Sequence, residues 1–341
     1  MKRYVLVCLL SLAALCTQAA VGLTQLAGLA GDGPVTVFYP SSSAAMPVRR
    51  EPFTLELAEG GQPVRGNGRL VVISHGSGGS PWVHSDLARR LVEAGFVVAL
   101  PEHQGDNWHD MRQVGPESWR RRPAEVSRAI DAVARDARLS PLVSLDRVGM
   151  YGMSAGGHTA LTLAGGRWSP SALLKHCEAH LDDDFATCVG PTVQLDGGLL
   201  DGPKKAIARA VIRQRLDDVQ WYSHDEPRIK AVVAEVPFAV DFDMQSFTTP
   251  RMPLGLVRAG QDKWLTPAFH IGAVIKACTT CTVVADVPGA AHGSFLSPQP
   301  LKANLSANAA RLLLDPPGFD RSEVPRVHAQ IAAFMLKHLA P

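Results

Sequence analysis

Gly152-Met153-Ser154-Ala155-Gly156 is the stretch of this 341-residue sequence that decides the fold. It follows a short apolar run at residues 147–151 and precedes a segment, residues 157–164, whose composition favours a helix. A G-x-S-x-G motif between a strand and a helix is typical of a nucleophile elbow, a sharp turn that lifts the serine hydroxyl clear of the backbone. The glycines two positions before and after the serine come close to neighbouring backbone, where only glycine fits. The motif therefore predicts that Ser154 is a nucleophile.

Apolar runs and helical patterns alternate along the rest of the chain. From the third run onward most are continuously apolar, as expected for strands that are covered on both faces of a sheet. Strands are predicted at residues 35–39, 53–58, 70–74, 96–100, 148–151, 229–236, 254–259 and 282–287. Helices are predicted at residues 82–94, 123–138, 154–165, 267–277 and 323–339, with Pro123 in the first turn of the second helix. This order predicts an α/β fold with an eight-stranded, mostly parallel, doubly wound sheet whose first two strands form an antiparallel edge.

A serine hydroxyl needs a base to accept its proton, and the base needs an acid to orient it. Reactive groups of an open parallel sheet gather at the carboxyl ends of its strands, so we searched the residues that directly follow strands. His292 follows the last predicted strand among small residues and is the candidate base. Asp262 follows the strand at residues 254–259 and is the candidate acid. The competing histidines and carboxylates near strand ends are His75, His103, His158, Asp241 and Asp243, whereas Asp286 lies inside the last predicted strand and is interpreted as structural.

Two backbone N–H groups are the candidate oxyanion hole. Ala155, directly after the nucleophile, supplies one. The glycine-rich loop at residues 74–80 follows the third predicted strand and supplies the other, for which Ser77 is the candidate donor. The loop lacks both the Lys-Ser/Thr pair and the G-x-G-x-x-G spacing of phosphate-binding loops.

These motifs together resemble the α/β-hydrolase superfamily, in which the nucleophile, acid and base follow one another in the order Ser154, Asp262, His292. Within it the chain is most similar to the exported bacterial group labelled predicted dienelactone hydrolases, related to platelet-activating-factor acetylhydrolases and secreted polyesterases. The residues that carry the resemblance are 38–40, 74–79, 101–107, 122–123, 152–158, 259–262 and 289–292.

The resemblance implies a serine carboxylic-ester hydrolase that forms an acyl-enzyme on a small-molecule ester and uses no metal or other cofactor. True dienelactone hydrolases carry a cysteine nucleophile, so Ser154 favours a serine esterase over a dienelactone substrate. Met153 stands where this group often has histidine, which predicts a reshaped pocket. The alternatives are a lactonase, a peptidase or an acyltransferase on the same residues, or a non-catalytic binding protein that keeps the fold. The candidate pocket residues, each of which could equally lie in the core, are Trp108, Met153, Phe238, Trp264 and Leu296.

One interval, residues 166–228, is far longer than a crossover loop needs and predicts an insertion directly after the nucleophile helix. It could be a lid, a wall of the pocket or a peripheral segment. Its basic amphipathic part, residues 204–215, is shorter than the apolar helix of a lipase lid, which predicts a partly covered pocket for short-acyl esters.

The first 20 residues read as a secretory signal peptide, with Lys2 and Arg3 before an apolar core and small residues near position 20. They predict export to the periplasm or beyond as a single domain at residues 21–341, with lipid attachment at Cys16 as the alternative. No later apolar run approaches the roughly 20 residues of a membrane-spanning helix.

Four of the six cysteines follow the leader: Cys177, Cys188, Cys278 and Cys281. An even number in an exported protein favours disulfides, here Cys177–Cys188 and Cys278–Cys281 among three possible pairings. The spacing of the second pair also occurs in redox and zinc sites, but the chain has no second C-x-x-C motif.

The charge balance excludes a nucleic-acid footprint. Loss of the leader would leave 32 basic and 32 acidic residues, and the only basic run, residues 120–122, directly precedes a predicted helix. The sequence predicts no nucleic-acid partner and leaves the oligomeric state open.

Overall fold

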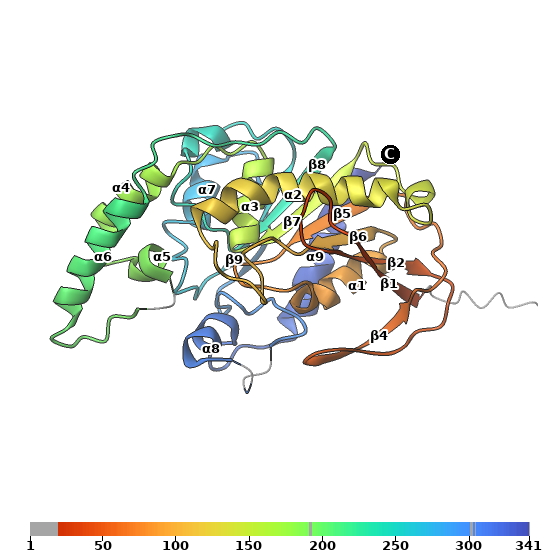
Figure 1. The fold of residues 1–341 in the computed structure, drawn as a ribbon, viewed down its shortest axis with the longest axis horizontal. Coiled ribbons are helices and arrows are strands. Elements are labelled where there is room, and N and C mark those ends of the chain that lie inside the picture. The colour runs from red at the N-terminus through yellow and green to blue at the C-terminus, as the bar shows by residue number, and fades with distance from the viewer. Residues whose placement is uncertain (1–19, 191–192, 301–302, 304, 341) are drawn as a thin grey trace, which may run out of the picture.

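A computed structural model describes residues 20–190, 193–300, 303 and 305–340. The chain forms an α/β fold around one mostly parallel sheet (Figure 1), as the sequence predicts. The predicted signal peptide lies, apart from Ala20, outside the described residues. Among the residues that are described, no helix is long and apolar enough to cross a membrane.

The sheet has ten strands in the order β10-β9-β8-β7-β5-β6-β2-β1-β4-β3. Strands β5 to β10 are parallel to one another, whereas β2 is antiparallel to both β6 and β1, and β3 is antiparallel to β4. The strands are β1 (Ala20–Leu26), β2 (Val35–Ser41), β3 (Met46–Arg50), β4 (Phe53–Glu59), β5 (Leu70–Ser74), β6 (Val97–Pro101), β7 (Val148–Met153), β8 (Ile229–Glu235), β9 (Leu254–Ala259) and β10 (Thr282–Val287).

The predicted number of eight strands is wrong, because β1 and β3 have no clear local signal. The residues of β1 continue the apolar leader, and only pairing along the whole of β2 makes them a strand. The ring of Tyr39 on β2 lies across Gly22 of β1, where a Cβ atom would lie 2.2 Å from the ring. Strand β3 is a five-residue edge strand with a proline and two arginines, and it is held by its hairpin with β4.

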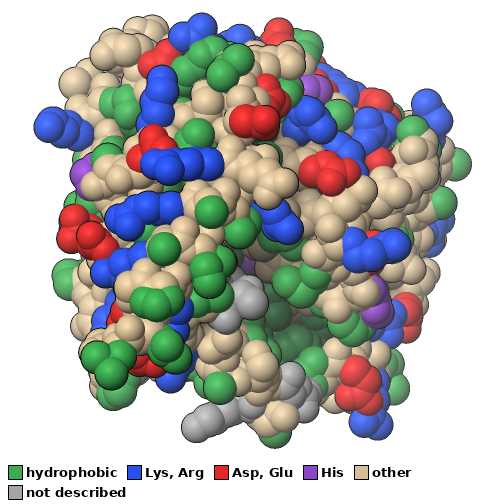
Figure 2. Space-filling model, turned by 60° about the vertical axis from the view of Figure 1, so that its left-hand side comes forward, with side chains coloured by type: hydrophobic (Ala, Val, Ile, Leu, Met, Phe, Trp, Pro, Cys, Tyr) green, Lys and Arg blue, Asp and Glu red, His purple; other side chains and the backbone are tan. Residues whose placement is uncertain are grey.

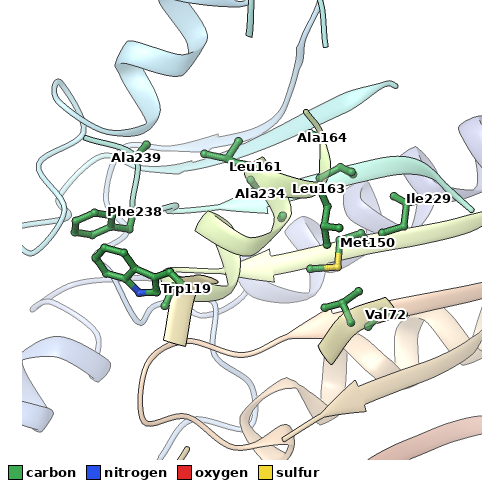
Figure 3. Close-up of a cluster of buried hydrophobic side chains, with 14 of the residues drawn as sticks. Val72, Trp119, Met150, Leu161, Leu163, Ala164, Ile229, Ala234, Phe238 and Ala239 are labelled. Atoms are coloured by element: carbon green, nitrogen blue, oxygen red, sulfur yellow. The ribbon is translucent and has the colours of Figure 1, made fainter. Parts of the chain in front are cut away.

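Helices cover both faces of the sheet and enclose a hydrophobic core on each. Helices α1 and α9 pack on one face, and α2 and α3 pack on the other (Figure 1). Figure 3 shows the core below α3, where the rings of Trp119 and Phe238 lie side by side with centroids 4.5 Å apart. The helices are α1 (Ser85–Glu93), α2 (Pro116–Arg135), α3 (Ala155–Leu163), α4 (Pro170–His180), α5 (Phe185–Val189), α6 (Asp201–Arg215), α7 (Ile271–Ala277), α8 (Ala307–Leu313) and α9 (Glu323–Leu339).

Helix α2 begins at Pro116 rather than at Pro123, so the predicted start of this helix is wrong. Pro123 lies inside the helix, where a proline removes one backbone hydrogen bond at a cost of about 3 kcal/mol. The added turns bury Trp119 and Arg122 under the loops at the carboxyl edge of the sheet. These tertiary contacts override the local preference of the proline.

The interval at residues 166–228 contributes α4, α5 and α6, which lie beside the sheet at the left of Figure 1. Cys177 on α4 and Cys188 on α5 form a disulfide, and Cys278 and Cys281 form another, which are the two expected pairs. The first disulfide ties two of these short helices together. In the described part of the chain, no group of three or more His, Cys, Asp or Glu side chains is placed to hold a metal ion.

Candidate active site

Ser154 joins β7 to α3 with a backbone φ of 58°, in the left-handed region that residues other than glycine seldom adopt. The glycines around it have no room for a side chain. A Cβ atom on Gly152 would lie 1.9 Å from the carbonyl oxygen of Gly156, and a Cβ atom on Gly156 would lie 2.0 Å from that of Ser74. The amide of Ser154 donates to the carbonyl oxygen of Glu235 on the neighbouring strand β8 at 3.0 Å. These close contacts hold the serine at the carboxyl edge of the sheet.

The structure brings Ser154, His292 and Asp262 together from three separate strand ends. The Oγ atom of Ser154 lies 3.0 Å from Nε2 of His292, and Nδ1 of His292 lies 2.7 Å from Oδ2 of Asp262. The other carboxylate oxygen of Asp262 accepts the backbone N–H groups of Trp264 and Leu265, each at 2.9 Å. This fixed carboxylate can hold the imidazole with Nε2 toward the serine, which is the arrangement for proton transfer from the hydroxyl.

The competing carboxylates lie away from His292. Asp241 pairs with His158 at 3.0 Å, and both side chains are fully buried beside α3. Asp243 caps a 3-10 turn at its Gln245 amide and pairs with Arg167. Asp286 pairs with Arg258 across β9 and β10.

The candidate oxyanion loop after β5 is held by a buried ion pair. Asp106 and Arg122, both fully buried, lie 2.9 Å apart. Arg122 also donates to the carbonyl oxygen of His75 at 2.6 Å and more weakly to that of Gly76. Asp106 accepts the amide of Gly78 at 2.9 Å and the hydroxyl of Ser77 at 3.2 Å. The pair therefore fixes this loop from both sides.

This loop and the nucleophile elbow each place one free backbone donor near Ser154. Gly76 lies against the elbow, because a Cβ atom there would be 3.4 Å from Cβ of Ser154. Within the described residues, the amides of Ser77 and Ala155 have no hydrogen-bond acceptor. This arrangement leaves both amides available to an oxyanion.

Burial would raise the pKa of Asp106, but the guanidinium of Arg122 and the donors of Ser118 and Gly78 lower it below its usual range. Burial lowers the pKa of His75 well below its usual value, and the charge of Arg122 adds to that effect. The loop thus rests on a charged pair beside a neutral imidazole. Asp106 and Arg122 lie in the motifs at residues 101–107 and 122–123, but the sequence predicted no role for either residue.

A second serine, histidine and carboxylate triplet lies below this loop. Nε2 of His103 lies 2.7 Å from Oγ of Ser74, and Nδ1 of His103 lies 2.5 Å from Glu125. All three side chains are buried, and the carbonyl of Ser74 is covered by Gly156. Burial lowers the pKa of His103 and raises that of Glu125. Because no substrate can reach Ser74, this triplet is a structural link between β5, β6 and α2.

The five candidate pocket residues do not share one surface. Trp108 is half exposed, and its amide donates to the carbonyl of Gly79 in the oxyanion loop. Met153 and Phe238 are buried on opposite faces of the sheet, and Leu296 is buried in the core below α1 and α9. Of the five, Trp264 alone lines a cavity that has a volume of about 690 Å³.

That cavity lies beside the Asp262 and His292 loops, and its other walls come from the interval at residues 166–228 and from α8 and the residues after it. Figure 2 shows a hollow lined with hydrophobic side chains on this side of the molecule. The wall that α8 provides was not predicted, because no local sequence pattern indicates which helix packs against which loop.

Glu235, at the carboxyl end of β8, is a buried carboxyl group that the site contains but sequence analysis did not single out. Its side chain is 1% exposed, and neither carboxyl oxygen has a hydrogen-bond partner in the described part of the chain. Burial raises its pKa to about 8, and the nearby hydroxyl of Tyr151 offsets only a little of that. The sequence signal that could have identified Glu235 is its position directly after the apolar run at residues 231–234.

Comparison with known proteins places part of the chain in a family. A model of the dienelactone hydrolase family, which belongs to the α/β-hydrolase superfamily, matches residues 60–218, a segment that holds Ser154 and the candidate oxyanion loop. No curated protein matches the chain.

Glu235 makes a prediction about stability. Between about pH 4.5 and 8 its carboxyl group is protonated in the folded chain and ionised in the unfolded chain, so the free energy of unfolding falls as the pH rises through this window. Glu235→Gln removes this dependence. We expect the free energy of unfolding of the variant, relative to the natural chain, to increase with pH up to about 8, by up to about 1.4 kcal/mol per pH unit.

Urea unfolding at a series of pH values measures this difference. Glu56→Gln, at an exposed position on β4, is the matched control and should give a difference that does not follow this pattern. A flat difference for Glu235→Gln between pH 5 and 8 would contradict the prediction.

Proposed function

We propose that the chain, which matches a family model of the α/β-hydrolase superfamily over residues 60–218, is a serine carboxylic-ester hydrolase that works through an acyl-enzyme. The observation that supports this most is the continuous chain of hydrogen-bonding distances from Ser154 through His292 to Asp262. The match to the dienelactone hydrolase family supports hydrolysis of an ester or a lactone.

In the proposed reaction, Oγ of Ser154 attacks the ester carbonyl while Nε2 of His292 takes the hydroxyl proton. Asp262 accepts the Nδ1 proton in a hydrogen bond and stabilises the imidazolium. The amides of Ala155 and Ser77 donate to the oxygen that becomes negative, and the Asp106–Arg122 pair keeps the second donor in place. The imidazolium then gives its proton to the departing alcohol, and water attacks the acyl-enzyme with His292 again as base.

We further propose a short acyl group and an exported enzyme. Met153 and Gly76 lie close together beside Ser154, since a Cβ atom on Gly76 would be 3.2 Å from Sδ of Met153, and this leaves little room for a long acyl chain there. The two disulfides support an oxidising compartment such as the periplasm or the exterior.

The test of the function is an ester panel on the purified chain. We expect p-nitrophenyl acetate or butyrate to be hydrolysed with a kcat/KM more than tenfold above that of the palmitate, with no jump when the ester forms micelles. Ser154→Ala should abolish the reaction, and a fluorophosphonate should label Ser154, mapped by peptide mass spectrometry, but leave Ser74 unlabelled. A folded chain that hydrolyses none of these esters and takes no label would favour a binding protein, and lactones or peptides preferred to esters would favour the other hydrolases.

The assignment of the acid predicts that Asp262→Asn folds normally but loses roughly 10³–10⁴-fold in kcat, because asparagine holds the imidazole in the wrong tautomer. Asp243→Asn, a change of the same chemistry at a loop that faces Arg167, is the matched control and should keep its activity. Comparing the two kcat values in thermally stable protein decides between them. Loss at Asp243 with normal activity at Asp262 would overturn the assignment.

The Asp106–Arg122 pair predicts a defect in the chemical step. A lysine at position 122 cannot reach the carbonyls of the loop and the Asp106 carboxylate at once, so the Ser77 amide would lose its fixed direction. Removal of one oxyanion donor costs about 10²–10³-fold in kcat. We therefore expect Arg122→Lys to lower kcat by about 10²-fold and to change KM by less than about threefold.

Arg121→Lys, which alters the partly exposed neighbour on the same helix, is the control and should leave both constants unchanged. A purely structural role for Arg122 would instead lower the melting temperature without weakening a boronic-acid transition-state analogue more than the substrate.

A further inference from the structure

The cavity of about 690 Å³ beside the Asp262 and His292 loops is large enough for a small-molecule group, since ligand pockets commonly measure about 300–1,000 Å³. Its lining is mixed: apolar side chains such as Phe185 from α5 and Leu314 after α8 alternate with charged and polar ones such as Lys263 and Arg311. The volume far exceeds the room that the proposed short acyl group needs.

Hydrogen bonds between different segments of the chain fix the walls of the cavity relative to one another. The indole Nε1 of Trp264 donates to the carbonyl oxygen of Arg311 at 3.2 Å, which ties the Asp262 loop to α8. The hydroxyl of Thr187 on α5 donates to the carbonyl oxygen of Trp264 at 3.0 Å. Asp182 and Asp315 at the cavity are already paired, with Lys205 and Arg321. Two of the acidic side chains at the wall are therefore neutralised by partners of the protein itself.

The cavity lies beside the loops that carry the candidate acid and base. Gln261 and Ala291 both line it, and they are the chain neighbours of Asp262 and His292. Consecutive Cα atoms are about 3.8 Å apart, so this wall stands one residue from the imidazole. The amide of Gln261 donates to the carbonyl oxygen of Ala290 at 2.8 Å, which makes the two loops one wall. No residue of the oxyanion loop lines the cavity.

The direction of proton transfer decides which part of an ester this space can receive. The imidazolium of His292 must reach the oxygen of the departing alcohol, so that oxygen lies on the histidine side, whereas the carbonyl oxygen points to the amides of Ser77 and Ala155. We propose that this cavity binds the alcohol part of the ester, and that the alcohol is a bulky one whose carbon chain lies against the apolar side chains of the wall. The proposal rests on the ester-hydrolase function proposed above and names its substrate class.

The test compares acetates that share one acyl group and differ only in the alcohol. Ethyl, butyl and hexyl acetate have alcohols of similar acidity, so differences in kcat/KM report binding rather than leaving-group chemistry. We expect kcat/KM of the natural chain to rise at least tenfold from ethyl to hexyl acetate, measured below the solubility limit of each ester.

Variants then locate the effect. Ala310→Trp on α8 places a large ring in the cavity and should reduce the ratio of the hexyl to the ethyl value at least tenfold. Ala186→Phe on α5 fills the cavity from the opposite wall and should do the same if the first variant does not fold. Ala307→Trp, at an exposed position of α8 outside the cavity, is the matched control and should keep the natural ratio.

A flat series in the natural chain, or an unchanged hexyl-to-ethyl ratio in a folded cavity-filling variant, overturns the proposal. Failure of the underlying function looks different: Ser154 then takes no fluorophosphonate label, and no acetate is hydrolysed at all. An enzyme that is labelled and active on every acetate, but indifferent to the alcohol, leaves the function standing and refutes the alcohol site.

Discussion

The close approach of backbone around Ser154 is the constraint on which the rest of the site depends. A residue with a side chain at φ 58° stores of the order of 1–3 kcal/mol of strain, and it persists only when the surroundings over-determine it. Here the surroundings are the carbonyl oxygens of Ser74 and Glu235 and two glycines that allow strand, helix and loop to meet. Strands β5, β7 and β8 all end at this point. The turn at Ser154 therefore determines where the oxyanion loop after β5 and the end of β8 lie.

Buried ionisable side chains of two kinds lie near that turn. They avoid the cost of burying an unpaired charge in different ways. Asp106 and Arg122 stay charged because they pair with each other and each also hydrogen-bonds the oxyanion loop, which offsets the cost of removing charge from water. Glu235 has no such partner in the described part of the chain. Burial raises the pKa of its carboxyl group, which therefore stays protonated instead.

Much of this site could be predicted from local sequence, because the fold places chemistry directly after strands. The positions of Ser154, Asp262 and His292 follow from three apolar runs and the turns behind them, and the structure brings the three side chains within hydrogen-bonding distance. Eight of the ten strands carry the same local signal. The start of α2 does not, because burial of Trp119 and Arg122 against distant loops outweighs the local preference of Pro123.

What local sequence could not supply is the arrangement of segments that have no strand to fix them. Helices α5 and α8 are far apart in the chain, and only their contacts with Trp264 make them two walls of one cavity. The same pattern explains why single aromatic and apolar residues were poor guides to the pocket. Phe238 and Leu296 follow strand ends as well as Trp264 does, but a core forms on each face of the sheet and takes them in.

The groups proposed to carry out the reaction and those proposed to bind the alcohol therefore lie in different parts of the molecule. The groups proposed to act on the carbonyl lie on short turns that the sheet fixes, and moving any of them would disturb three strands at once. The cavity walls come from an interval after α3 and from the segment before α9, which reach the sheet through the acid and base loops, side-chain hydrogen bonds and packing against its core. Because these walls are separate from the elbow, the proposed alcohol site could change in size while the geometry around Ser154 stays constant.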